Sequence, residues 1–152
     1  MAVGVGMLVI AVWIVTLLLP NPQPLTVEAA TAKVTGYLDR IESTLPVGSV
    51  LERSEEITQD SCPIEERGGQ AKVRRVVYVD PVLDRVSWAA TLSGEFPEAD
   101  GWVVRVRTLD SRENLDIRIV GRDLIIMNLT ASDASGQARI TMGATSECSQ
   151  PG

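Results

Sequence analysis

The chain has 152 residues, a hydrophobic content of 45%, no histidine and a formal net charge of −6. A chain of this size holds one domain with its own core, and its many Val, Ile and Leu residues argue against disorder over most of its length. The acidic balance argues against nucleic-acid binding, and the lack of histidine removes the commonest general base and zinc ligand.

The N-terminal segment from Ala2 to Leu19 is apolar and carries no charged side chain. Eighteen residues at about 1.5 Å per residue form a helix of roughly 27 Å, close to the hydrocarbon thickness of a bilayer. The run is longer than the apolar core of a signal peptide, and no basic residue precedes it. We therefore expect residues 1–19 to be an uncleaved transmembrane signal anchor in the lipid bilayer. Cleavage stays open as the alternative, because residues 30–32 (ATA) match a cleavage pattern.

Prolines at positions 20, 22 and 24 follow the apolar segment at once. Alternating prolines cannot continue a helix and favour an extended, semi-rigid spacer. Residues 20–25 are therefore predicted to be a short linker that holds the following domain close to the membrane surface. We expect that domain to span residues 26–148, with a tail at 149–152.

Two cysteines, Cys62 and Cys148, lie far apart in the sequence. An even number of cysteines behind an export-type segment favours a disulfide formed in an oxidising compartment. The bridge would close a loop of about ninety residues, worth about 4–5 kcal/mol in the chain-entropy model. It would place the domain outside the cytoplasm, in a single-pass protein of the cell membrane. The alternative is a cytosolic protein with two unpaired buried thiols.

Two segments have the periodicity of amphipathic helices. Apolar residues recur at spacings of three and four from Val27 to Leu45, with Thr26 as the N-cap and Pro46 ending the helix. A second helix is predicted over 81–96, with Pro81 in its first turn. The side chains expected on one side of this second helix are Val82, Val86, Ala89, Ala90 and Ser93.

The remaining segments alternate like strands. Strands are predicted at residues 50–58, 71–79, 101–109, 114–120, 124–130 and 137–145, with a loop at 60–70. The glutamates of the first strand favour an edge position. Hairpin connections dominate the second half, so we expect a mainly antiparallel sheet with both helices on one face, a two-layer α+β sandwich.

Basic side chains are expected to gather on the sheet face that points away from the helices. They are Lys72, Arg74, Arg105, Arg107, Arg118 and Arg139. Asp116 is the one acidic residue expected among them. Such a face would suit an anionic lipid head group or an acidic partner. The alternative is an ordinary solvated face, because one side of an antiparallel sheet needs polar cover.

No residue pattern indicates catalysis, a cofactor or a metal site. The chain has no histidine, both cysteines are expected in a disulfide, and neither a nucleophile elbow nor a phosphate-binding glycine loop occurs. Acidic pairs such as Glu55-Glu56 are typical of solvated surface charge. An enzyme is therefore the least favoured class of function.

The pattern of cysteines and strands resembles a known group of domains. It consists of Ser61-Cys62, Gly68-Gly69, a strand of Arg and Val, Gly101-Trp102 and Ser146-Glu147-Cys148. Between Leu51 and Cys148 the chain resembles small exported or lipoprotein-like domains of actinobacteria whose function is undefined. The resemblance implies an extracytoplasmic α+β domain closed by a disulfide, and it implies no active site. The chain differs from the lipoproteins because no lipid-accepting cysteine follows its apolar segment.

These observations predict a membrane-anchored extracytoplasmic binding or accessory module. Its expected setting is a larger membrane complex of the cell envelope. The alternative is a small exported domain that carries a lipid or another ligand, which would need an apolar cavity between the sheet and the helices.

Overall fold

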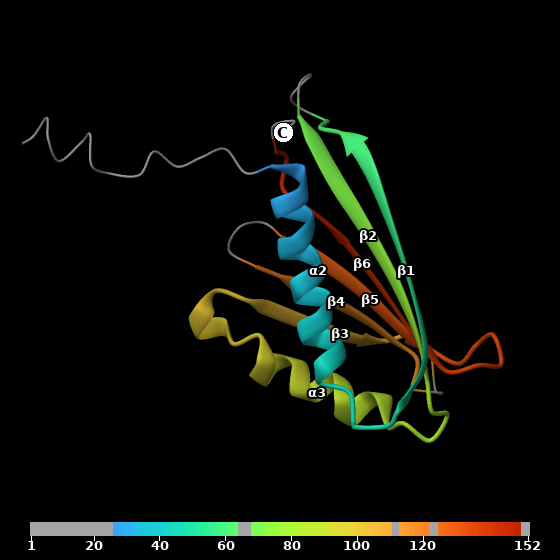
Figure 1. Ribbon diagram of the computed structural model, residues 1–152. Helices are drawn as coiled ribbons and strands as arrows, with labels where there is room; N and C mark the ends of the chain where they lie inside the picture. Colours follow the sequence, from blue (N-terminus) through green and yellow to red (C-terminus); the bar gives the residue numbers. More distant parts are fainter. Residues whose placement is uncertain (1–25, 64–67, 111–112, 122–124, 150–152) are drawn as a thin grey trace, which may run out of the picture.

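The computed structural model describes residues 26–63, 68–110, 113–121 and 125–149. These residues form one antiparallel sheet with two helices on one of its faces (Figure 1). The predicted anchor at 1–19 and the linker at 20–25 lie outside the described residues. Within the described ranges, no helix has both the length and the apolarity needed to cross a bilayer.

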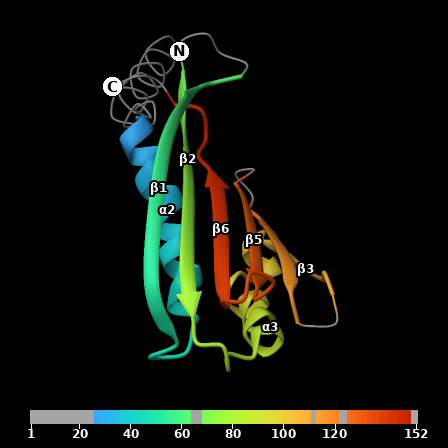
Figure 2. The ribbon, with the colours of Figure 1, turned by 90° about the vertical axis from the view of Figure 1, so that its right-hand side faces the viewer.

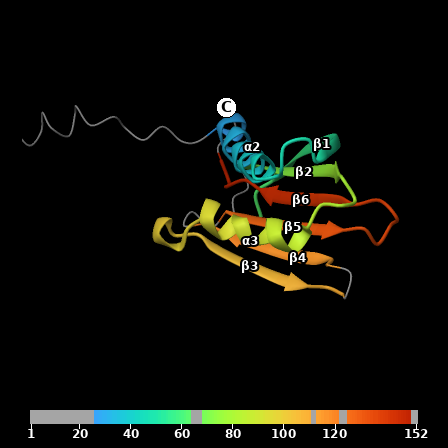
Figure 3. The same cartoon turned by 90° about the horizontal axis from the view of Figure 1, so that it is seen from below.

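The sheet has six strands in the order β1-β2-β6-β5-β4-β3, and each neighbouring pair is antiparallel. The strands are β1 Val50–Ser61, β2 Gly69–Val79, β3 Val103–Thr108, β4 Leu115–Val120, β5 Ile126–Ser132 and β6 Arg139–Thr145. Seen from the end of the molecule, the helices and the sheet form two layers (Figure 3). The expected α+β architecture of an antiparallel sheet with helices on one face is confirmed for the described residues.

Helix α2 (Val27–Ser43) has the predicted cap and the predicted buried stripe. The N–H of Ala29 donates to Oγ1 of Thr26 at 3.2 Å, which satisfies one free donor of the first turn. The buried residues are Val27, Ala30, Val34, Leu38 and Ile41. They fix α2 over β2 and β6.

Helix α3 (Arg85–Glu95) begins four residues later than predicted, and Pro81 lies in the turn before it. The carboxylate of Asp84 accepts a hydrogen bond from the N–H of Ser87 at 2.9 Å and sets the start of the helix. The predicted apolar side was also wrong, because Val86 is exposed. The buried residues are Arg85, Trp88, Ala89 and Leu92. The large apolar surfaces of Trp88 and Leu92 decide which face turns inward. A single 3-10 turn, η1 (Glu98–Asp100), follows α3.

One continuous hydrophobic cluster fills the space between the layers. Leu38 and Leu92 from the helices and Ile117, Leu129 and Met142 from the sheet are all fully buried. The two layers therefore share one core.

An aromatic contact joins the two helices to the start of β3. The ring of Trp102 lies edge-on to the rings of Tyr37 and Phe96, with centroids 5.0 Å apart in each pair. Arg40 lies over the Phe96 ring and also pairs with Glu95 of α3. The helices are therefore fixed to each other as well as to the sheet.

Strand β1 is the edge strand that the glutamates indicated, but it is longer than predicted. The hairpin extends β1 to Ser61 and starts β2 at Gly69, so residues predicted as loop belong to strands. Strand β1 lies at the edge of the sheet beside β2 (Figure 2). Every residue of β1 is exposed, and α2 contacts mainly β2 and β6. Strand β1 therefore depends on its ladder with β2 and on polar contacts.

The predicted disulfide between Cys62 and Cys148 is confirmed. Beside it, Ser149 forms a bridge with Gly69, and Lys33 of α2 pairs with Glu147 at 2.6 Å. The disulfide, the start of α2 and the last described residues therefore lie at one end of the molecule.

Candidate functional site

The register of the strands places all six predicted basic residues on the open face of the sheet, opposite the helices. Four of them alternate with buried residues that face the helices, namely Lys72, Arg74, Arg118 and Arg139. Arg105 and Arg107 lie on the same face because they are paired with Arg118 and Asp116 of β4. The expectation that Asp116 alone opposes them was wrong. Strand β1 carries Glu52, Glu56 and Asp60 to the same face, since they lie opposite Tyr78, Arg74 and Gln70.

The six basic residues do not gather into one cluster. Lys72 pairs with Asp60 at 2.6 Å, and Arg107 pairs with Asp116 at 3.0 Å. Arg105 lies directly opposite Arg118 across the β3–β4 ladder. Arg139 lies toward the far end of the sheet, opposite Tyr78.

A depression of about 490 Å³ lies on the open face over β2, β6 and β5. Most of its lining consists of polar side chains of the open face together with one glycine. These residues are Glu56, Thr58, Lys72, Arg74, Asn128, Thr130, Thr141, Gly143 and Thr145. We call it the open-face hollow. Of the six predicted basic residues, it brings together Lys72 and Arg74.

Gly143 is at the centre of the open-face hollow. It lies between Arg74 of β2 and Asn128 of β5 in the sheet. Its φ is not among the positive values found at Gly48, Gly101 and Gly136. A Cβ built on it would meet only the carbonyl oxygen of Asn128, at an ordinary 3.9 Å.

Neither the backbone nor the neighbouring atoms require a glycine at position 143. A glycine inside a strand costs about 0.5–1 kcal/mol relative to alanine, and it often marks a place where another molecule approaches. The missing side chain keeps the hollow open. Gly143 was not predicted as a site residue, although a lone glycine between buried strand residues was a usable signal.

The side chains around Gly143 can bind a polar anion. Arg74 is exposed and forms no ion pair with any described residue, and a guanidinium can bind phosphate or carboxylate with two parallel hydrogen bonds. The threonine hydroxyls and the amide of Asn128 can each donate and accept hydrogen bonds. Glu56 adds an acceptor on the β1 side. This arrangement suits a ligand that carries both negative charge and hydroxyl groups.

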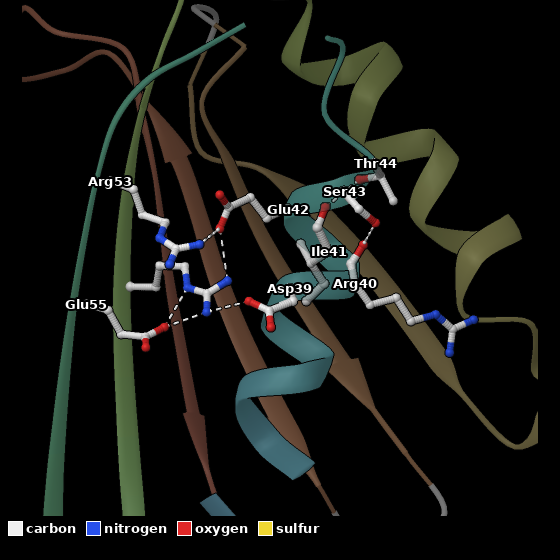
Figure 4. Close-up of polar contacts among 9 residues, drawn as sticks. Asp39, Arg40, Ile41, Glu42, Ser43, Thr44, Arg53 and Glu55 are labelled. Carbon is white, nitrogen blue, oxygen red and sulfur yellow. Dashed lines mark hydrogen bonds and ion pairs between the residues drawn. The ribbon is translucent and has the colours of Figure 1, made fainter. Parts of the chain in front are cut away.

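A second cluster of charged residues lies on the other face of the sheet, between α2 and β1 (Figure 4). The side chain of Arg75 is only 1% exposed, and it pairs with Asp39 at 2.7 Å, Glu42 at 2.9 Å and Glu55 at 2.5 Å. Arg53 of β1 reaches Glu42 at 3.6 Å. We call these five residues the Arg75 cluster.

The Arg75 cluster joins α2, β1 and β2 through ion pairs. Burial lowers the pKa of Arg75, but hydrogen bonds and charge from Glu55 and Asp39 outweigh burial and raise the pKa above its ordinary value. The guanidinium therefore stays charged, and its donors are used within the protein. The cluster links α2 to the exposed strand β1.

A third polar region surrounds the start of α3. A depression of about 540 Å³ is lined by Asp84, Arg85, Glu113 and Asp133 among others. Arg85 is buried and pairs with Asp133 at 3.2 Å, so its charge is used internally. No group of three or more potential metal ligands occurs in the described part of the chain. This region provides less for a ligand than the open-face hollow.

No protein-family model matches the sequence, and no curated protein or solved structure matches the chain. The resemblance to exported actinobacterial domains therefore stays an expectation.

Proposed function

We propose that this chain is a membrane-anchored, extracytoplasmic binding module that takes phosphate-bearing polyols in the open-face hollow. Gly143 carries the proposal, because a glycine that neither the backbone nor the neighbouring atoms require leaves a depression in the middle of the six-stranded sheet. Arg74 supplies positive charge beside it, Lys72 is paired with Asp60 at its edge, and threonines and Asn128 supply hydrogen bonds. An anionic lipid head group and a soluble phosphorylated sugar alcohol share this chemistry.

The position of the hollow suits a ligand at the membrane surface. Arg74 lies five residues along β2 from Gly69, which is about 17 Å at 3.3–3.4 Å per residue. Gly69 lies at the end of the molecule where α2 begins. If residues 1–19 anchor the chain as proposed, the hollow lies over the middle of the sheet, about 17 Å from the end of the domain that follows the anchor.

The disulfide supports the proposed location outside the cytoplasm, since such bonds form and persist in oxidising compartments. A binding role also fits a subunit of a larger envelope complex, in which the domain would present or sense a head group. The alternative is a carrier with an apolar cavity, but the buried side chains of both layers form one hydrophobic cluster, which favours a surface site. We propose no catalytic role.

Ligand binding can be tested on the full chain in a neutral detergent. We expect glycerol phosphate to raise the midpoint of thermal unfolding, because a ligand that binds only the folded state stabilises it. Uncharged glycerol at the same concentration is the matched control. A bilayer arm compares discs of phosphatidylglycerol with discs of phosphatidylcholine, with hydrogen exchange of β2 and β6 as the readout.

The two arms separate the possible sources of the ligand. A response to phosphatidylglycerol discs alone supports a lipid head group, and a response to glycerol phosphate alone supports a soluble ligand. If neither probe changes unfolding or exchange relative to its uncharged or zwitterionic control, the proposed function is wrong.

A further inference from the structure

The two edges of the sheet carry opposite charge on the same face. Strand β1 presents Glu52, Glu56 and Asp60 on the open face, whereas β3 presents Arg105 and Arg107 there. Within the described residues, no strand lies beyond either edge, and Glu56 and Arg105 form no ion pair. From these edges we propose that copies of this chain associate head to tail, with β1 of one copy adding to β3 of the next.

The direction of the strands permits this contact. Because all five neighbouring pairs are antiparallel, the two edge strands of the six-stranded sheet run in opposite directions. A second copy in the same orientation therefore brings its β1 antiparallel to β3 of the first. The helices of both copies stay on the same side of the joined sheet.

The free backbone groups of the two edges also match. Gly69 and Ala71 of β2 exchange hydrogen bonds with Ser149 and Ser146, on the β6 side. Backbone groups alternate in direction along an antiparallel strand, so the even-numbered residues of β2 form their hydrogen bonds with β1. Their partners in β1 are also even-numbered. The backbone N–H and C=O groups of odd-numbered β1 residues such as Ile57 therefore point away from β2, toward the free edge.

The same alternation applies to β3. Leu109 donates to Asn114 on the β4 side, so Arg107 and Arg105 also bond to β4. Val104 and Val106 therefore point their backbone groups outward. On both edges the outward residues carry side chains on the helix side of the sheet, as a continuous ladder requires.

One register of β1 against β3 pairs opposite charges and also brings exposed apolar residues into contact. Residue numbers run in opposite directions along an antiparallel pair, so placing Glu56 opposite Arg107 also places Ile57 opposite Val106. Ile57 is 47% exposed and Val106 is 46% exposed in the single chain. In this register Arg105 lies diagonally between Glu56 and Asp60, within reach of both carboxylates.

Pairing β1 of one copy with β3 of another fits these edges better than pairing either strand with the same strand of a second copy. Pairing β3 with β3 would bring arginines together on the open face, and pairing β1 with β1 would bring glutamates together. Like charges opposite each other destabilise a strand pair. A contact of one strand pair is small, so we expect weak association that salt reduces further.

The test uses the full chain in a neutral detergent, with mass measured by sedimentation velocity from low to high micromolar concentration. We expect the wild type to form a series of oligomers of increasing size at low salt. Arg105→Glu with Arg107→Glu, and separately Glu56→Arg with Asp60→Arg, should each reduce association at least tenfold. Mixing the two variants should restore it, because each then offers the edge that the other needs.

Backbone pairing is tested by a matched pair of proline substitutions. Ile57→Pro removes an outward N–H that β2 does not use, so it should keep the unfolding midpoint and abolish association. Thr58→Pro removes a ladder bond to β2 and should lower the midpoint. The proposal is overturned by a wild type that stays a single copy, by no restoration on mixing, or by association that survives Ile57→Pro.

Discussion

Arg74 and Arg75 are neighbours in β2, yet their guanidinium groups lie on opposite faces of the sheet. Arg75 is buried between α2 and β1, where Asp39, Glu42 and Glu55 use its donors. Arg74 is exposed beside Gly143 and has no ion pair among the described residues. The same type of side chain therefore forms ion pairs inside the protein on one face of the sheet and remains accessible to a ligand on the other.

Substituting Arg75 should have the largest effect. Arg75→Met keeps the buried methylene groups but leaves three carboxylates around an uncharged side chain, and removing one partner of a buried ion cluster costs about 3–5 kcal/mol. Because Asp39 is 57% exposed, we expect a loss near the low end, about 3 kcal/mol in the free energy of unfolding.

Denaturant titration of the full chain measures this loss, and hydrogen exchange should show β1 opening first. Arg74→Met is the matched control for removing one arginine from β2. Equal losses of stability in the two variants would contradict the division of roles between Arg74 and Arg75.

Substituting Arg74 should affect binding rather than folding. We expect Arg74→Met to change the free energy of unfolding by less than about 0.5 kcal/mol, as for an exposed surface site. Affinity for glycerol phosphate should fall about tenfold or more, which corresponds to roughly 1.4 kcal/mol. Binding titrations of Arg74→Met and Arg107→Met check this. Arg107→Met is the control and should keep its affinity, because Arg107 lies on the same face outside the hollow.

The sequence predicted the sheet, its antiparallel character and the disulfide because these depend on alternation, hairpin spacing and cysteine number. Arg75 is a charged residue among the buried side chains of β2. Its partners could not be predicted, because Asp39 and Glu55 meet Arg75 only after α2 packs on the sheet.

The open-face hollow was predicted only in part. Lys72 and Arg74 were among the predicted basic residues, but the acidic contribution of β1 depends on its register with β2. The start of α3 was misplaced because proline and aspartate both favour helix starts, and the hydrogen bond from Ser87 to Asp84 decides between them.

The helix cap at Asp84 should produce the smallest effect, which is a pH dependence of the stability of α3. The side-chain hydrogen bond from Ser87, followed by the backbone N–H of Ser87, lowers the pKa of Asp84. A lowered folded-state pKa means that the stabilisation is present above the unfolded-state pKa and is lost as pH falls through the folded-state pKa.

We therefore expect α3 to loosen below about pH 4, where an ordinary aspartate becomes protonated. Asp84→Asn keeps a capping oxygen but cannot be protonated in this range. The midpoint of thermal unfolding of this variant should therefore fall less steeply at acid pH than that of the wild type. An acid limb identical to that of the wild type would show that Asp84 contributes nothing to it.

The most direct test of the binding site is a graded filling of the open-face hollow at Gly143. Gly143→Ala and Gly143→Val add side chains into space where the nearest atom is 3.9 Å from the new Cβ, so both should fold and be stabilised by about 0.5–1 kcal/mol. We predict that affinity for glycerol phosphate falls from glycine to alanine to valine while the free energy of unfolding rises. Undiminished binding by a stably folded Gly143→Val protein would contradict the proposed site.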